Sequence, residues 1–292
     1  MQKIIPFLWF DKEARQAAEF YKNCFGEVEI TSSYTISDTP SGEVEIISLS
    51  IFDFQFQFMS AGPDFKLNPS ISYHVVCKTP DEVDTIWNRI SVGGKALMEL
   101  GSYPFSPRYG WIEDRFGVSW QIICNKEHNS KQRVTPIIMF VGEVCGKTEE
   151  AVTHYTSIFK DSSVGSFFRY TEGESPDKVG SVKYVPFELE HIAFGAMDSA
   201  HEHAFNFSEA TSFLVNCEDQ AEIDYFWDKL SADPSAEQCG WLKDRYGVSW
   251  QIAPADIEKY FNGPREQLAK LYKVLFEMKK IDILELDKAY NS

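Results

Sequence analysis

A phrase that occurs twice constrains the fold of this 292-residue chain more than any other feature. GWIEDRFGVSWQII begins at Gly110 and GWLKDRYGVSWQIA begins at Gly240, with ten of the fourteen positions identical. Weaker matches precede both copies: FYKNCF at 20–25 corresponds to HYTSIF at 154–159, and Trp87 corresponds to Trp227. Because the offset drifts between 130 and 140 residues, we infer a duplicated domain with loop insertions rather than a short-period solenoid. The loop after the second helix is about ten residues longer in the first copy.

Each copy holds the same order of elements twice. Helical spacing of apolar residues predicts helices, and alternation with period two predicts strands. Thr79 is the expected N-cap of the second helix, with Pro80 at its first position. The predicted strands of the first copy are 3–10, 27–36, 43–52, 54–60, 71–77 and 117–124, and its predicted helices are 11–25 and 79–90. The order is βαβββ followed by βαβββ, which indicates an α+β protein.

Composition excludes several classes of partner. The net charge of -16 disfavours nucleic acid and anionic membranes, because binding to phosphate needs a basic surface. The apolar run 4–10 is too short for a signal peptide or a membrane span. None of the six cysteines forms a C-x-x-C pair, so we expect free thiols and a cytoplasmic protein.

The motifs resemble one superfamily over nearly the whole chain. IPFLWF…EFYKNCFG, DEVDTIW and GWIEDRFGVSWQI, with the partners PIIMF…HYTSIF, AEIDYFW and GWLKDRYGVSWQI, resemble the vicinal oxygen chelate superfamily of glyoxalase I, bleomycin-resistance proteins and extradiol dioxygenases. The nearest branch is the PhnB-like group, often labelled demethylubiquinone methyltransferase-like. The resemblance implies two tandem glyoxalase-like domains, each a pair of βαβββ units. We place them at 1–128 and 134–255, with a linker at 129–133 and a C-terminal helical tail at 256–292.

Most of the repeated phrase has a structural explanation. Asp114 to Gly117 suits a type I turn between two strands. In the strand that follows, Val118, Trp120 and Ile122 are expected to face the helices, and Gln121 the groove of the curved sheet. Only the glutamine is left without a structural explanation.

The resemblance also implies a test for a metal site. Metal-dependent members place a His or Gln on the first strand, a Glu on the fourth, a His on the fifth and a Glu on the eighth. Here the first strand offers no ligand, and the other three offer Gln57, His74 and Gln121. Without an anionic ligand, the desolvation of a divalent cation is not offset. We therefore predict no metal or other cofactor, and keep a divalent metal on His74, Gln57 and Gln121 as the weaker alternative.

The expected groove is apolar with a few polar groups, which is typical of a small-molecule site. Its candidate residues are Phe7, Trp9, Gln57, His74, Arg108, Trp111, Gln121 and Gln251, with Phe56 and Tyr109 as further aromatic candidates. We predict a protein that binds a small molecule, with the catalytic residues unknown and catalysis itself left open. One alternative is a metal-dependent glyoxalase-type lyase, isomerase or dioxygenase, and another is a non-enzymatic sequestering protein of the resistance type. A methyltransferase gains no support, because the chain contains no G-x-G cofactor loop.

The tail carries an apolar stripe of its own. Leu268, Leu271, Leu275 and Met278 lie at helical spacing. We expect the stripe to pack on its own chain, with a dimer contact as the alternative. The predicted assembly is a monomeric pseudo-dimer or a homodimer.

Overall fold

The computed structural model describes residues 2–39, 42–261 and 263–291, which form four successive units and a tail. Unit 1 holds β1 (Ile4–Phe10), α1 (Ala14–Phe25), β2 (Val28–Thr39), β3 (Gly42–Ile51) and β4 (Phe54–Ser60). Unit 2 holds β5 (Ile71–Cys77), α2 (Pro80–Ile90), β6 (Lys95–Tyr103), β7 (Ser106–Glu113) and β8 (Ser119–Cys124). Unit 3 holds β9 (Val134–Phe140), the 3-10 helix η1 (Gly142–Val144), α3 (Thr148–Ile158), β10 (Ser163–Val164), β11 (Phe168–Arg169), β12 (Val182–Leu189) and β13 (Ile192–Asp198). Unit 4 holds β14 (Thr211–Cys217), α4 (Gln220–Leu230), β15 (Trp241–Lys243) and β16 (Ser249–Pro254), and the tail holds the 3-10 helix η2 (Ile257–Phe261), α5 (Arg265–Glu277) and α6 (Ile283–Asn291).

Local sequence signals place these elements well. The predicted strands and helices of the first half are confirmed, with small differences at their ends. Thr79 caps α2 as predicted, since its hydroxyl oxygen accepts the N–H of Glu82 at 3.2 Å, and Pro80 is the first helical residue. Glu82 in turn accepts the N–H of Lys78 at 2.9 Å, which completes a capping pair at this end of the helix.

The strands form two sheets, and each sheet crosses from one half of the chain to the other. The seven-stranded sheet runs β15-β16-β14-β1-β4-β3-β2, and so joins unit 4 to unit 1. The nine-stranded sheet runs β10-β12-β13-β9-β5-β8-β7-β6, with β11 beside β12, and so joins unit 3 to unit 2. The joints are the antiparallel pairs β1–β14 and β5–β9. The domain bounds 1–128 and 134–255 stay predictions, because strand pairing runs across the junction between them.

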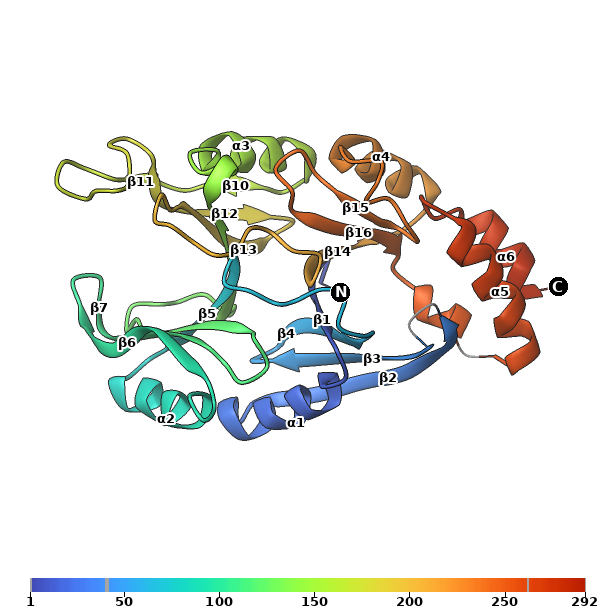
Figure 1. The fold of residues 1–292 in the computed structure, drawn as a ribbon, viewed down its shortest axis with the longest axis horizontal. Coiled ribbons are helices and arrows are strands. Elements are labelled where there is room, and N and C mark those ends of the chain that lie inside the picture. The colour runs from blue at the N-terminus through green and yellow to red at the C-terminus, as the bar shows by residue number, and fades with distance from the viewer. Residues whose placement is uncertain (1, 40–41, 262, 292) are drawn as a thin grey trace.

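Each half nevertheless has an aromatic core of its own. Trp120 of β8 is fully buried and packs against Tyr21 and Phe25 of α1, with ring centroids 5.1 and 4.9 Å away. Trp250 of β16 packs in the same way against Tyr155 of α3 at 5.5 Å. In Figure 1, α1 and α2 lie along one long side of the molecule and α3 and α4 along the opposite side. Trp120 therefore faces the helices, as its place in the alternating strand predicts.

The aspartate of the repeated phrase ties this core together. One oxygen of Asp114 accepts the backbone N–H groups of Phe116 and Val118, at 2.8 and 3.0 Å. The other accepts the Tyr21 hydroxyl at 2.6 Å and the Trp120 indole N–H at 2.9 Å. Asp244 repeats all four contacts in the second half. The two copies share the phrase because each half closes its turn, its last strand and its first helix on one carboxylate.

Unit 4 departs from the predicted βαβββ order. It has only two strands after its helix, because the roughly ten residues that build β6 in unit 2 have no counterpart here. The tail takes the place of the missing strand: the N–H groups of Cys239 and Gly240 bond to the carbonyls of Met278 and Lys279, at 2.9 and 2.7 Å. A short edge covered by other chain segments is protected against pairing with a second sheet.

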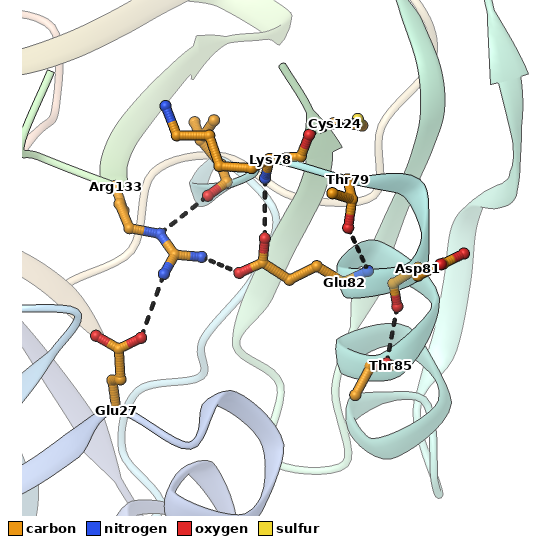
Figure 2. A network of polar contacts seen from close by, with 9 residues as sticks. Glu27, Lys78, Thr79, Asp81, Glu82, Thr85, Cys124 and Arg133 are labelled. Atoms are coloured by element: carbon orange, nitrogen blue, oxygen red, sulfur yellow. Dashed lines mark hydrogen bonds and ion pairs between the residues drawn. The ribbon is translucent and has the colours of Figure 1, made fainter. Parts of the chain in front are cut away.

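The residue at the end of the predicted linker fastens the junction between the halves. Figure 2 shows the Arg133 guanidinium between the carboxylates of Glu82 at the start of α2 and Glu27 of unit 1. Its Nε also donates to the carbonyl of Val76 at 3.1 Å, and its guanidinium carbon lies 3.8 Å from the centre of the Phe52 ring. Lys3, just before β1, makes a similar contact between the halves, an ion pair to Glu222 of α4 at 2.5 Å.

The helices are short. The longest, α5, has 13 residues. Within the described ranges, no helix combines the length and apolar character that crossing a bilayer requires.

Candidate functional site

The candidate groove residues fall on two different sheets. Phe7, Trp9, Gln57 and Gln251 lie in the seven-stranded sheet, whereas His74, Trp111 and Gln121 lie in the nine-stranded sheet. We call the first set, with Ser48 and Ser212, the Gln57 face. We call the second set, with Ser72, Tyr109 and Ser119, the His74 face. The structure does not bring Gln57 together with His74 and Gln121.

A hydrogen-bonded chain organises the His74 face. The side-chain oxygen of Gln121 lies 2.6 Å from the Tyr109 hydroxyl and 2.7 Å from His74 Nε2, and its nitrogen donates to Ser72 at 2.7 Å. Because the amide oxygen faces both partners, Tyr109 and His74 are the donors. His74 then carries its proton on Nε2, and Nδ1 keeps a lone pair.

Strand register brings these groups together. His74 lies directly opposite Gln121, and Ser72 opposite Ser119, in the parallel pair β5–β8. Trp111 lies opposite Gln121 in the antiparallel pair β7–β8, and its indole N–H donates to Ser119 at 2.7 Å. Side chains directly opposite on adjacent strands share one face of a sheet.

Burial keeps His74 uncharged at neutral pH. Desolvation lowers the pKa of His74 from 6.5 to about 4, and the hydrogen bond to Gln121 only partly opposes that shift. His74 is nevertheless only partly buried, while Gln121 behind it is 2 % exposed. The face thus presents a neutral imidazole with an acceptor nitrogen.

Apolar side chains surround the polar chain. The Tyr184 ring of β12 stacks beside His74, with centroids 6.2 Å apart and planes 22° apart. Met98 of β6 lies opposite Trp111. The sequence prediction missed Tyr184 and Met98. Alternation along 182–189 could have flagged Tyr184, but Met98 follows a register shift in β6 that alternation does not anticipate.

The Gln57 face repeats the glutamine–serine hydrogen bond of the His74 face but lacks a histidine. Gln251 donates to Ser212 at 2.9 Å, as Gln121 does to Ser72. Leu214 stands opposite Gln251, in the place that His74 has on the other face. Phe7 and Trp9 make edge-to-face contacts with Trp241, at 5.9 and 6.3 Å.

The tail covers part of the Gln57 face. Ser48 bonds to Gln57 at 3.3 Å and donates to the carboxylate of Glu258 in η2 at 3.1 Å. Phe261 of η2 stacks on Tyr34 of β2, with centroids 5.1 Å apart and planes 13° apart. Leu271 and Leu275 of α5 are buried, so the predicted stripe packs on its own chain. In Figure 1, α5 and α6 lie at the right-hand end of the molecule, away from β6 and β7 of the His74 face.

Two candidates point away from both faces. Arg108 follows strand alternation to the side opposite Tyr109, where its Nε donates to Asp84 of α2 at 2.5 Å. Gly110, on that same side, has no room for a side chain, because a Cβ there would lie 2.4 Å from the Trp87 ring of α2. Phe56 packs between the sheets against Tyr73 and Trp120.

The residues of the His74 face do not fit a divalent cation. Gln121 Oε1 already accepts two hydrogen bonds, so the face offers Nδ1 of His74 with no carboxylate beside it. The neighbouring unit contributes Ile137 and Gly195 to the face, and a Cβ at Gly195 would lie 2.9 Å from the Tyr184 hydroxyl. Across the described ranges, no three His, Cys, Asp or Glu side chains gather into a metal-binding group.

Several solved structures are similar to this chain, and two of them, with TM-scores above 0.5, share its fold. The PhnB protein from Bacillus cereus, a putative 3-demethylubiquinone-9 3-methyltransferase, is 32% identical, with 42% of this chain and 100% of that chain covered and a TM-score of 0.40. A glyoxalase I mutant from Zea mays has a TM-score of 0.55 at 13% identity, covering 88% of this chain and 94% of its own. A putative dioxygenase from Bacillus subtilis has a TM-score of 0.51 at 9% identity, covering 97% of this chain and 94% of its own.

The match to a sequence-family model shows which family this chain belongs to. No curated protein matches the chain. The family model described as 3-demethylubiquinone-9 3-methyltransferase matches twice, at residues 2–123 and 132–253. With nearly the whole chain before the tail accounted for, this protein belongs to that family as a tandem duplicate with the glyoxalase-like vicinal oxygen chelate fold.

Proposed function

We propose that the His74 face binds a small organic molecule without a resident metal. One observation carries the proposal: a buried amide, Gln121, accepts hydrogen bonds from His74 and Tyr109 and is itself held by a third hydrogen bond to Ser72. Polar groups fixed in this way on an apolar surface orient a ligand and provide its specificity. The Gln57 face lacks the histidine and is partly covered by the tail.

Net charge and cysteine chemistry support the proposed partners and compartment of the protein. The net charge of -16 disfavours polyanionic partners. The six cysteines are free thiols, which suits a reducing compartment such as the cytoplasm. The family's name describes a methyltransferase, but no G-x-G loop for a cofactor occurs in the sequence.

The test is a calorimetric screen of the full chain against a library of small aromatic and aliphatic metabolites. A true ligand of the His74 face should lose at least about tenfold in affinity with His74→Ala, the loss expected for one hydrogen bond with its packing. Leu214→Ala is the matched control, because Leu214 holds the equivalent position on the other sheet. Equal loss in both variants would refute the assignment to this face.

Metal content separates the proposal from the metal-dependent alternative. We expect protein purified without chelators or metal resin to carry well under one divalent ion per chain, because the face offers a single imidazole nitrogen as a ligand atom. Mass spectrometry that finds a stoichiometric ion, lost in His74→Ala, would make a glyoxalase-type lyase, isomerase or dioxygenase the better conclusion.

A further inference from the structure

We infer that the ligand of the His74 face is an uncharged, flat aromatic molecule with one hydrogen-bond donor, such as a phenolic hydroxyl, which it gives to His74 Nδ1. This inference rests on the proposed function and adds the chemical class of the ligand.

The donor requirement follows from the orientation of His74. Its Nε2 is committed to Gln121, whose amide is held in turn by Tyr109 and Ser72. No described residue bonds to Nδ1, and the His74 side chain is only partly buried, so this nitrogen is a free acceptor on the face. A fixed acceptor of this kind selects a ligand that donates, because an analogue without the donor leaves the nitrogen desolvated and unpaired.

The uncharged character follows from the neighbours of His74. Gln121 and Thr135 flank it across the strands, and Ser72 and Val76 flank it along β5. None of these side chains is charged, and His74 itself is neutral because burial lowers its pKa to about 4. A carboxylate or phosphate would be desolvated here without a counter-charge.

The aromatic character follows from the surround. The Tyr184 ring lies nearly parallel to the His74 ring, with the planes 22° apart, and Trp111 lies across from Gln121 with Met98 opposite Trp111 on the next strand. Offset stacking on aromatic rings and contact with a methionine sulfur both favour a flat π-system over an aliphatic chain.

Three naphthalene probes of similar size separate these properties. 2-Naphthol is neutral at pH 7 and donates, 2-methoxynaphthalene is neutral and does not donate, and 2-naphthoate is an anion. Binding to the full chain is followed by the change in probe fluorescence. We expect 2-naphthol to bind about tenfold more tightly than the ether, the effect of one hydrogen bond, and 2-naphthoate to bind more weakly than either.

Two variants assign the preference to Nδ1. His74→Phe keeps an aromatic ring beside Tyr184 but has no acceptor, so naphthol and ether should bind it equally. His74→Asn can place its side-chain oxygen near the position of Nδ1 and should restore part of the preference. Thermal unfolding of each variant shows whether it is folded.

The outcomes separate the inference from the proposed function. Equal binding of naphthol and ether to the wild type, or a preference that survives in His74→Phe, overturns the donor inference. Tight binding of naphthoate overturns the inferred neutrality. If other ligands bind in a His74-dependent way while all three probes fail, the class is wrong and the proposed function stands. If no ligand of any class depends on His74, both fail.

Discussion

Asp114 shows how one side chain can join the parts of a domain. It is 4% exposed and accepts four hydrogen bonds, from a turn, a strand and a helix. Desolvation raises its pKa to about 6, although each of those hydrogen bonds pulls the pKa down. Two backbone amides, an indole and a phenol all donate to this side chain, so a carboxylate, which only accepts hydrogen bonds, suits the position.

Asp114→Asn should destabilise the protein by about 3 kcal/mol, because the introduced NH₂ group faces either the two backbone N–H groups or the Trp120 N–H, and none of these can accept a hydrogen bond. Denaturant unfolding measures this loss. Asp244→Asn is the internal match in the second half and should cost a similar amount. A change below about 0.5 kcal/mol in both variants would contradict the role given to this carboxylate.

His74 gives the protein a stability that depends on pH. Its pKa is about 4 in the folded state and 6.5 when unperturbed. Between these values the unfolded chain binds more protons, so stability is present above pH 6.5 and is lost as the pH falls toward 4. We expect the melting temperature of the wild type to fall more between pH 7 and pH 4.5 than that of His74→Phe. Asp114, whose raised pKa acts in the opposite direction, is common to both proteins and cancels in the comparison. Parallel curves would show that His74 titrates normally.

At the scale of elements, the tail is part of the fold. It replaces the strand that unit 4 lacks, and it lays Glu258 and Phe261 over the Gln57 face. Leu271 is fully buried at its centre. A segment held by side-chain packing and a few edge hydrogen bonds opens more readily than the sheets it covers.

Leu271→Ala should loosen the tail selectively. The cavity should cost about 2–4 kcal/mol of local stability and speed proteolytic cleavage within 256–291, while the two sheets resist digestion. Limited proteolysis read by intact mass is the measurement. Leu284→Ala is the control, since Leu284 lies in the same tail but is 62% exposed. Similar cleavage rates for the two variants would argue against a packed tail.

For the whole molecule, the decisive feature is that both sheets cross between the halves. A fragment of residues 1–128 would keep its aromatic core but would leave β1 and β5 without β14 and β9. Since β5 corresponds to β14 in the duplicated sequence, a second copy can supply the missing partner.

We expect fragment 1–128 to form a homodimer that pairs β1 of one copy with β5 of the other. Light scattering during size-exclusion chromatography should give twice the mass of the fragment, whereas the full chain should elute as a monomer. A soluble, folded monomeric fragment would show that the cross-half pairing is dispensable.

The sequence predicts the strands and helices within each unit better than it predicts which units pair with each other. Alternation and capping place β8 and α2 and turn Trp120 inward, because those signals are local. Strand pairing between units, in contrast, is not set by local signals. The strands β9 and β14 are both apolar and both suit β1 or β5, so only the assembled chain decides that Gln57 and His74 lie on separate sheets. Arg108 was a groove candidate for a related reason: it is adjacent to Tyr109, and the register of β7 sends the two side chains to opposite faces.

That crossing has an evolutionary consequence. In a homodimer of single halves, every substitution appears on both faces at once, so the two faces stay alike. When the two halves are fused into one polypeptide, each face can change independently. One face can then keep an imidazole while its twin accepts a leucine and comes to rest under the chain's own end. The two faces of this chain have become unlike in this way: one carries His74 beside Gln121, and the other carries Leu214 and is partly covered by the tail.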